Sequence, residues 1–414
     1  MAINRRTRLL IPGALLALAL LSGCGSSSSD TSTIPTAASI FYAHSAVFKN
    51  NSTSQLLYTV GYNGFGQLGD GTLTTRTTAA PVAGLDRVNR FAAGGDHTLS
   101  LAFTNVSSVF GWGSNQQGQI GAAKSTTGSD AHSKVPVKIP LHGEVTDVAA
   151  GAFHSLAVVA GQVRSWGFNG NGQLGDATLI SNTTPVAVVT AVPASTDTTP
   201  ITGITSVAAG GSHSLALTAD HKVYAWGNNG SGQLGKDPAG TSGTFSTTAE
   251  LVQVNGADLA NVVQIASGGG TSYARLGNGE VWFWGYNPVA RATSFAPTKI
   301  VMPAGAAVIA RISAGWDHLL LLAGDGTLWG WGFNGYAQLG DGTQVSTAAP
   351  VQVRFSSTRV MDRVTSISAF GNHSMARSGG VWYGWGDNSN GQLGNPILTN
   401  DIGFLSVPVR VGGL

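Results

Sequence analysis

Charged residues are scarce in this 414-residue chain. They make up 10% of it, against about a quarter of an average soluble protein. Arg5, Arg6 and Arg8 lie in a segment that we expect to be removed, which leaves 22 − 3 = 19 basic residues against 20 acidic ones. A mature chain with a net charge this close to zero offers no electrostatic footprint for nucleic acid, and we expect no nucleic-acid partner.

Cysteine is also nearly absent, because Cys24 is the only one, and this excludes a disulfide framework. Before it, a basic start leads into an apolar stretch from Leu9 to Leu21. That stretch is too short to span a membrane comfortably, and it predicts a signal peptide over residues 1–23.

The four residues Leu21-Ser22-Gly23-Cys24 resemble the bacterial lipobox, which implies that Cys24 becomes the acylated first residue of the mature protein. The alternative is an ordinary signal peptide with an incidental cysteine. Residues 24–39 are rich in serine and are predicted to form a flexible tether. Gly25 stands where an aspartate would, by analogy with known lipoproteins, retain the protein at the inner membrane. We therefore expect a lipid-anchored protein of the bacterial cell envelope, at the outer membrane if one is present.

Recognisable catalytic and ligand-binding motifs are missing as well. There is no phosphate-binding loop, no Gly-x-Ser-x-Gly elbow and no candidate nucleophile with a base. His132, His142 and His221 lack metal-ligand spacing, and the Gly-Asp-Gly-Thr runs at 69–72 and 340–343 lack the acidic density of a calcium loop. The sequence therefore predicts no enzyme, no cofactor and no metal site.

Glycine is plentiful instead, with 58 residues, and two motifs recur in phase along the chain. The first is typified by "WGFNGNGQLGD" at Trp166 and the second by "AAGGSHSLALT" around His213. The fifth unit departs from both, because Thr271 replaces the histidine and "WGYNPVAR" at Trp284 lacks the Gly-Gln-Leu-Gly turn.

Each unit contains four short segments of alternating apolar residues, the pattern of β-strands joined by tight turns. Typical segments are "PVxV", as at residues 136–139, then "VTDVAAG", "HSLALT" and "KVYAWG". Seven such units over residues 40–414 predict an all-β, seven-bladed β-propeller of four-stranded blades. The chain ends in a PVxV-like segment, so we expect residues 407–411 to join the sheet of residues 40–61 and close the ring.

The paired motifs resemble those of the regulator of chromosome condensation repeat family over about residues 40–414. The resemblance implies a seven-bladed propeller that acts through protein–protein interaction. The best-known eukaryotic member is a nucleotide exchange factor for a small GTPase, but a lipobox points to a compartment where no such partner is expected.

The repeated histidines could suggest a Ser-His-Asp site at Asp96-His97 or Asp317-His318. A catalytic group should break the symmetry of a repeat, however, and these residues follow it. We therefore assign the repeated histidines and tryptophans to the structure. They are His44, His97, His154, His213, His318, His373, Trp112, Trp166, Trp226, Trp284, Trp331 and Trp385.

Large aromatic residues that vary between the loops are candidates for binding a partner, because such residues often dominate interfaces. They are Tyr62, Phe65, Phe153, Phe168, Tyr286, Trp316, Phe333 and Tyr336. The alternative is that several of them pack into neighbouring blades.

Pro288 and Arg291 mark the fifth unit as either degenerate or reshaped for a ligand. We expect a monomer that binds an unknown protein at the envelope through its loops. The alternatives are a glycan- or cell-wall-binding module and, less favoured, an enzyme with a site in the central channel or an exchange factor.

Overall fold

The computed structural model describes residues 43–50, 55–103, 107–122, 131–192, 195–236, 244–395 and 403–414. The predicted signal peptide, Cys24 and the tether of residues 24–39 lie outside these residues. All regular elements in the described ranges are β-strands. No helix there is long and apolar enough to cross a membrane.

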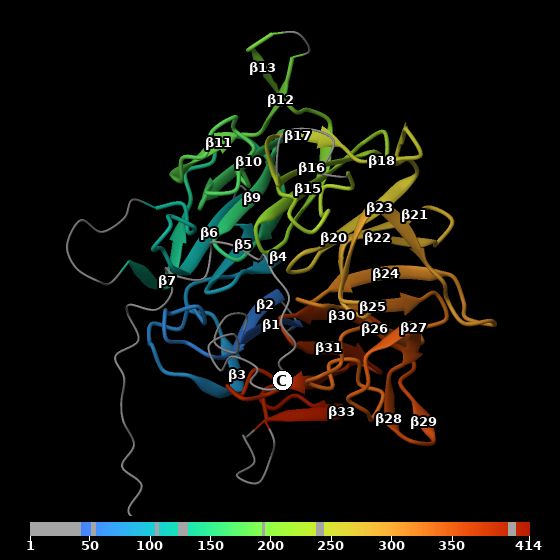
Figure 1. The fold of residues 1–414 in the computed structure, drawn as a ribbon. Coiled ribbons are helices and arrows are strands. Elements are labelled where there is room, and N and C mark those ends of the chain that lie inside the picture. Colours follow the sequence, from blue (N-terminus) through green and yellow to red (C-terminus); the bar gives the residue numbers. More distant parts are fainter. Residues whose placement is uncertain are drawn as a thin grey trace, which may run out of the picture. The chain divides into compact units, whose positions relative to one another are not determined.

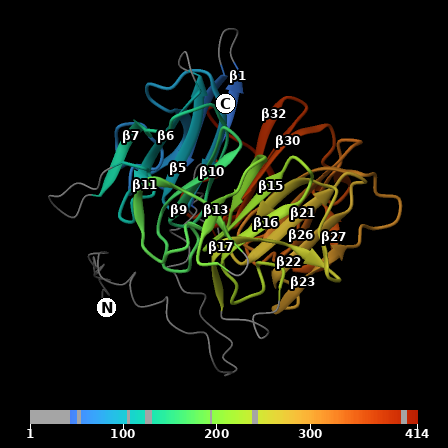
Figure 2. The same cartoon turned by 90° about the horizontal axis from the view of Figure 1, so that it is seen from above.

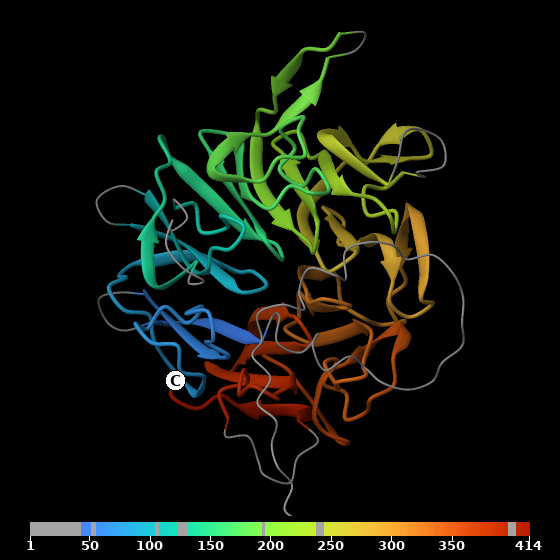
Figure 3. The same ribbon diagram turned by 60° about the vertical axis from the view of Figure 1, so that its left-hand side comes forward.

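Seven antiparallel sheets form the blades of a propeller around a common axis (Figures 1 and 3). Six have four strands in sequence order from the axis outwards, and blade 1 has three described strands. Blade 1 consists of β1 (His44–Asn50), β2 (Gln55–Gly61) and β3 (Arg76–Pro81). Blade 2 consists of β4 (Val88–Ala93), β5 (His97–Phe103), β6 (Ser107–Ser114) and β7 (His132–Lys138), and blade 3 of β8 (Val145–Ala150), β9 (His154–Val159), β10 (Gln162–Gly167) and β11 (Asn182–Ala187). Blade 4 consists of β14 (Ile204–Ala209), β15 (His213–Thr218), β16 (Val223–Asn228) and β17 (Phe245–Leu251), and blade 5 of β20 (Val262–Ser267), β21 (Thr271–Leu276), β22 (Val281–Asn287) and β23 (Ala292–Ile300). Blade 6 consists of β24 (Ile309–Ala314), β25 (His318–Ala323), β26 (Leu328–Gly332) and β27 (Thr347–Gln352), and blade 7 of β30 (Val364–Phe370), β31 (His373–Ser378), β32 (Val381–Asp387) and β33 (Phe404–Arg410).

Three small hairpins extend from the connections between blades. They are β12 (Val189–Ala191) with β13 (Thr198–Pro200), β18 (Gln253–Val254) with β19 (Ala257–Asp258), and β28 (Arg354–Ser356) with β29 (Arg359–Val360). The predicted fold class, a seven-bladed propeller, is confirmed.

Within a blade, the strand at the histidine motif is more deeply buried than the outermost strand. In the six four-stranded blades the second strand begins at the position of the histidine motif, and every residue of β9, β15 and β25 is buried. The outer strand is only half-buried, as in β11. The hydrophobic core therefore lies between blades, where each cluster takes residues from two neighbouring sheets.

Small residues at the ends of the inner strands let the blades converge on the axis. A Cβ atom on Gly151 would lie 2.2 Å from Cε1 of His154 and 2.6 Å from the carbonyl oxygen of Gly210 in the next blade. The backbone approaches so closely here that only glycine fits. The Ala-Ala-Gly run before His97, His154 and His213 thus meets a packing requirement.

Ring closure differs from the prediction. The C-terminal strand β33 pairs with β32 in blade 7, whereas blade 1 has an outer strand of its own, β3. The reason is that each PVxV segment completes the blade before it, so the unit assumed from the sequence straddled two blades.

Side chains and the C-terminal segment close the ring instead, and Figure 2 shows β1 near the last blade. The hydroxyl oxygen of Ser45 lies 2.6 Å from Nε2 of His373 and donates to the carbonyl of Gln392 at 2.7 Å. Val411, beyond β33, packs in a core cluster with Val47 of blade 1. The last blade therefore meets the first through the same kind of contact that joins the other blades.

Candidate functional site

A chain of buried histidines runs around the propeller. Nε2 of each histidine lies within hydrogen-bond distance of a hydroxyl oxygen in the next blade. That hydroxyl belongs to the serine or threonine directly after the histidine position of the repeat. The pairs are His44–Thr98, His97–Ser155, His154–Ser214 and His213–Ser272 at 2.9 Å, His318–Ser374 at 2.8 Å and His373–Ser45 at 2.6 Å. Residues more than 50 positions apart are thereby joined across each of these blade boundaries.

The hydrogen bonds of the partner hydroxyls show which ring nitrogen of each histidine carries the proton. The hydroxyl of Ser155 donates its one hydrogen to the carbonyl of Gln119. It must therefore accept from His97, which places the proton of that imidazole on Nε2. Burial lowers the pKa of all six histidines to about 3, so each is neutral at pH 7.

No Ser-His-Asp site is formed at the positions that suggested one. A triad needs a carboxylate on Nδ1 of the histidine, but Nδ1 of His97 and Nδ1 of His318 have no hydrogen-bond partner. Among the described residues of the channel wall, Ser267 alone is a histidine-bonded serine outside the repeat position, with its hydroxyl oxygen 2.8 Å from Nε2 of His213. The pKa of His213 is too low for a general base near neutral pH, and its Nδ1 is also unpartnered.

The repeated tryptophans connect the same blade boundaries. Nε1 of Trp226, for example, donates at 2.9 Å to the carbonyl of Gln173 in the preceding blade, which also accepts from Ser214. Trp112, Trp166, Trp284 and Trp385 make the equivalent bond at the same distance. Trp331 is the exception, because it donates to Ala348 within its own blade.

Polar residues of the Asn-x-x-x-Gln loops satisfy backbone groups of those loops. Oδ1 of Asn169 accepts from the amide of Leu174, and its Nδ2 donates to Asp176 and to nearby carbonyls. Oε1 of Gln173 accepts from the amide of Asn171. These loops are therefore rigid platforms for the side chains that they carry.

All eight candidate aromatic residues lie at one end of the propeller. His154 pairs with Gly167, so the start of the second strand and the end of the third strand meet there. Phe153 and Phe168 flank that pair, and the amide of Phe168 donates to the carbonyl of Phe153. We call this end, with the connections between the first and second and between the third and fourth strands, the loop face. Each of the eight residues is half-buried.

Several of these aromatic rings rest on their own loops. A Cβ on Gly170 or on Gly335 would lie 2.4 Å from Cζ of Phe168 or Phe333. Phe333 and Tyr336 meet edge to face with centroids 6.3 Å apart, and Tyr62 and Phe65 repeat that arrangement. The rings are thus held in fixed positions on the loop face while remaining partly accessible.

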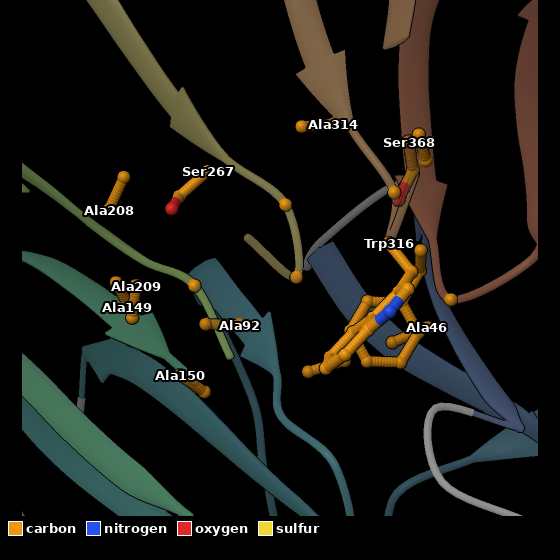
Figure 4. Close-up of a pocket in the computed structure, with 18 of the residues that line it drawn as sticks. Ala46, Ala92, Ala149, Ala150, Ala208, Ala209, Ser267, Ala314, Trp316 and Ser368 are labelled. Atoms are coloured by element: carbon orange, nitrogen blue, oxygen red, sulfur yellow. The ribbon is translucent and has the colours of Figure 1, made fainter. Parts of the chain in front are cut away.

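A cavity of about 220 Å³ occupies the central channel (Figure 4). Its walls are the ends of the inner strands, and no Lys, Arg, Asp or Glu is among the described residues that line it. Trp316 projects into it, and Ser267, Ser368 and Phe370 also line it. Sequence reasoning selected Trp316 but not the other three, although each interrupts the Ala-Ala-Gly pattern and could have been found on that basis.

Two carboxyl groups of the loop face lack the usual partners. Burial raises the pKa of Asp96 to about 7 and that of Asp317 to about 6. Burial, and then the charge of the neighbouring carboxylate, raise the pKa of the Tyr62 hydroxyl beside Asp96 and of the Tyr286 hydroxyl beside Asp317. Within the described ranges, no three His, Cys, Asp or Glu side chains gather to hold a metal ion.

Comparison with known proteins gives a consistent family. A family model described as RCC1-like domain matches residues 56–412. The chain is 30% identical over 344 residues to the ultraviolet-B receptor UVR8 of Arabidopsis thaliana, covering 80% of this chain and 72% of the receptor. It is 27% identical to the secretion-regulating guanine nucleotide exchange factor of Bos taurus, covering 83% and 76%. The crystal structure of Prp20p from Saccharomyces cerevisiae superposes with a TM-score of 0.69 at 23% identity, covering 91% of this chain and 88% of Prp20p.

Proposed function

Because the chain belongs to the family of RCC1-like domains, we propose that it is a non-enzymatic propeller that binds another protein through its loop face. The observation that carries this proposal is the concentration of eight half-buried aromatic residues at one end, on loops fixed by their own hydrogen bonds. Rigid aromatic side chains lose little entropy on binding and are frequent interface hot spots. Exchange activity belongs to the bovine relative by its name, and we do not extend it to this chain.

The binding role is tested by crosslinking on intact cells with a loop-face variant, Phe168→Ser, Phe333→Ser and Tyr336→Ser combined. We expect the wild-type protein to capture one discrete protein and the variant to lose most of that capture, since hot-spot truncations each weaken binding by about 2 kcal/mol or more. The measurement is the yield of crosslinked partner at equal protein level and equal melting temperature.

The matched control changes apolar residues at the opposite end. Val301 and Val308 are 73% and 66% exposed and are the first and last residues of the connection from β23 to β24. Val301→Ser with Val308→Ser should leave capture unchanged. Equal capture by the loop-face variant would contradict the proposal, and loss of binding to purified peptidoglycan in that variant would favour the glycan-binding alternative.

We further propose that the mature protein is anchored to the cell envelope through acylated Cys24. The lipobox-like residues 21–24 and the serine-rich residues 24–39 support this location. Cells grown with a radiolabelled fatty acid should incorporate the label into the wild-type protein and not into Cys24→Ser. Equal labelling of the two proteins would refute the anchor without affecting the binding proposal.

A further inference from the structure

The repeat breaks at one boundary, between blades 5 and 6. Thr271 stands in place of the histidine in blade 5, and Leu319 stands in place of the hydroxyl residue in blade 6. Both partners of one hydrogen bond are therefore replaced together. Pro288 occupies the space that glutamine fills in the other units. A Cβ atom built on Gly332 would lie 3.3 Å from Cγ of Pro288, just as a Cβ atom built on Gly167 would lie 3.3 Å from Cα of Gln119.

The boundary is repacked and not merely eroded. Tyr273, which is fully buried, replaces the leucine, methionine or alanine of the other blades. Its ring meets Trp331 edge to face at 6.4 Å, and Phe283 contacts the same tryptophan at 5.0 Å. A degenerate unit would leave voids where these aromatic rings pack, so the changes preserve stability while altering the loop face above.

Two aromatic side chains of that loop face lie against Gly269 and Gly270, within a run of three residues without side chains, Gly268 to Gly270. The indole ring of Trp316 packs against Gly269, because a Cβ atom built on that glycine would lie 2.4 Å from Cε2 of the ring. Tyr286 lies next to Gly270, because a Cβ atom built on that glycine would lie 3.4 Å from Cβ of Tyr286. Asp317 follows Trp316 in the chain and raises the pKa of the Tyr286 hydroxyl through its charge, after burial.

Asp317 differs from the other acidic groups of the loop face in what it contacts. Asp387 accepts hydrogen bonds from Ser389, and Asp70 pairs with Arg76 at 2.8 Å. Among the described residues, the carboxylate of Asp317 has neither a hydrogen-bond donor nor an ion-pair partner. A largely buried carboxylate of this kind is stabilised by any cation that reaches it. The faces of tryptophan and tyrosine rings also attract cations.

We propose that Trp316, Tyr286 and Asp317 form a receptor for a lysine or arginine side chain of the partner protein. This deepens the proposed function and rests on it. The cation lies against the aromatic rings, and its charge meets the carboxylate of Asp317. Arg291 is exposed and close enough to Tyr286 to lower the pKa of its hydroxyl. Its positive charge at the rim of the receptor repels the incoming cation and weakens its binding.

Asp96 provides a matched control within the same chain. It occupies the same repeat position in blade 2, and its Oδ1 likewise has no hydrogen-bond partner. It is only 3% exposed, however, and Gly95 stands where blade 6 has Trp316. A ligand therefore cannot reach the carboxylate of Asp96, and blade 2 places no aromatic ring beside it at the position of Trp316.

The test is a titration of the purified protein with acetylated, amidated Gly-Lys-Gly and Gly-Arg-Gly. Gly-norleucine-Gly and Gly-Glu-Gly with the same blocked ends serve as uncharged and anionic controls. Binding is followed by the NMR signal of the Trp316 indole N–H, identified as the signal lost in Trp316→Phe. We expect the cationic peptides to shift this signal saturably, with affinity about tenfold weaker in Asp317→Asn, unchanged in Asp96→Asn and stronger in Arg291→Gln.

Equal binding of the norleucine peptide, or equal affinity of Asp317→Asn, would overturn the inference. Its failure can be told apart from failure of the proposed function. If crosslinking still captures a partner that depends on the loop face, but Asp317→Asn captures it as well as the wild type, only the cation receptor is wrong. If nothing is captured on cells, the proposed function fails, and the peptide titration still decides the receptor by itself.

Discussion

Acidification from pH 7.5 to 5.5 is expected to lower the free energy of unfolding by about 5 kcal/mol. The six buried histidines have a pKa of about 3 in the folded protein, against 6.5 for the free side chain. Between these two values the unfolded chain binds protons that the folded chain does not, so stability is full above pH 6.5 and falls as the pH drops. Together the six histidines contribute a loss of about 8 kcal/mol at pH 5.5.

Asp96 and Asp317 act in the opposite direction. Their pKa values are raised to about 7 and about 6, so the folded protein takes up their protons first and gains stability on acidification. This offsets about 3 kcal/mol of the histidine effect over the same interval. The net loss is measured by urea denaturation, followed by tryptophan fluorescence, at several pH values between 7.5 and 5.5.

His154→Gln is the matched control for this pH dependence. The glutamine amide can donate to Ser214 in place of the imidazole but does not titrate. Below pH 6.5 the slope of the unfolding free energy against pH should fall by about 1.4 kcal/mol per pH unit, which corresponds to one proton. A wild-type profile that is flat from pH 7.5 to 5.5 would show that the histidines are not held neutral in the folded protein.

Trp226→Ala is expected to destabilise the protein by about 3–5 kcal/mol. The indole is fully buried in a cluster that includes Leu156 and Val158 of blade 3 and Val207 of blade 4. Removing it leaves a cavity between two blades and takes one of two donors from the Gln173 carbonyl. The loss is measured as the change in unfolding free energy from the urea midpoint.

Trp226→Phe separates the two parts of that effect. Phenylalanine fills most of the space but has no N–H for the Gln173 carbonyl, so we expect a smaller loss of about 1–2 kcal/mol. A loss below about 1 kcal/mol for Trp226→Ala would mean that the blade boundary collapses around the missing ring and that the tryptophan is not a main support of the fold.

The sequence by itself determined the fold class and the number of blades. A four-stranded unit cannot bury both faces alone, so a motif that recurs in phase requires neighbours that are stacked in the same way. The same regularity indicated that His154 and Trp226 are parts of the repeat, and both are buried. It also placed the variable aromatic residues on loops, because they follow the Trp-Gly step or precede the histidine.

Tertiary structure alone decided where each blade begins and how the ring closes. A periodic sequence has no marked starting point, so the PVxV segment could be assigned equally to the blade before it or after it, and only the pairing of β33 with β32 resolves this. Likewise, the joint replacement at Thr271 and Leu319 is invisible along the chain, since the two residues are far apart in sequence and meet only across a blade boundary. Periodicity specifies what each unit contains, whereas the contacts between units, including those around Asp317, depend on their arrangement in space.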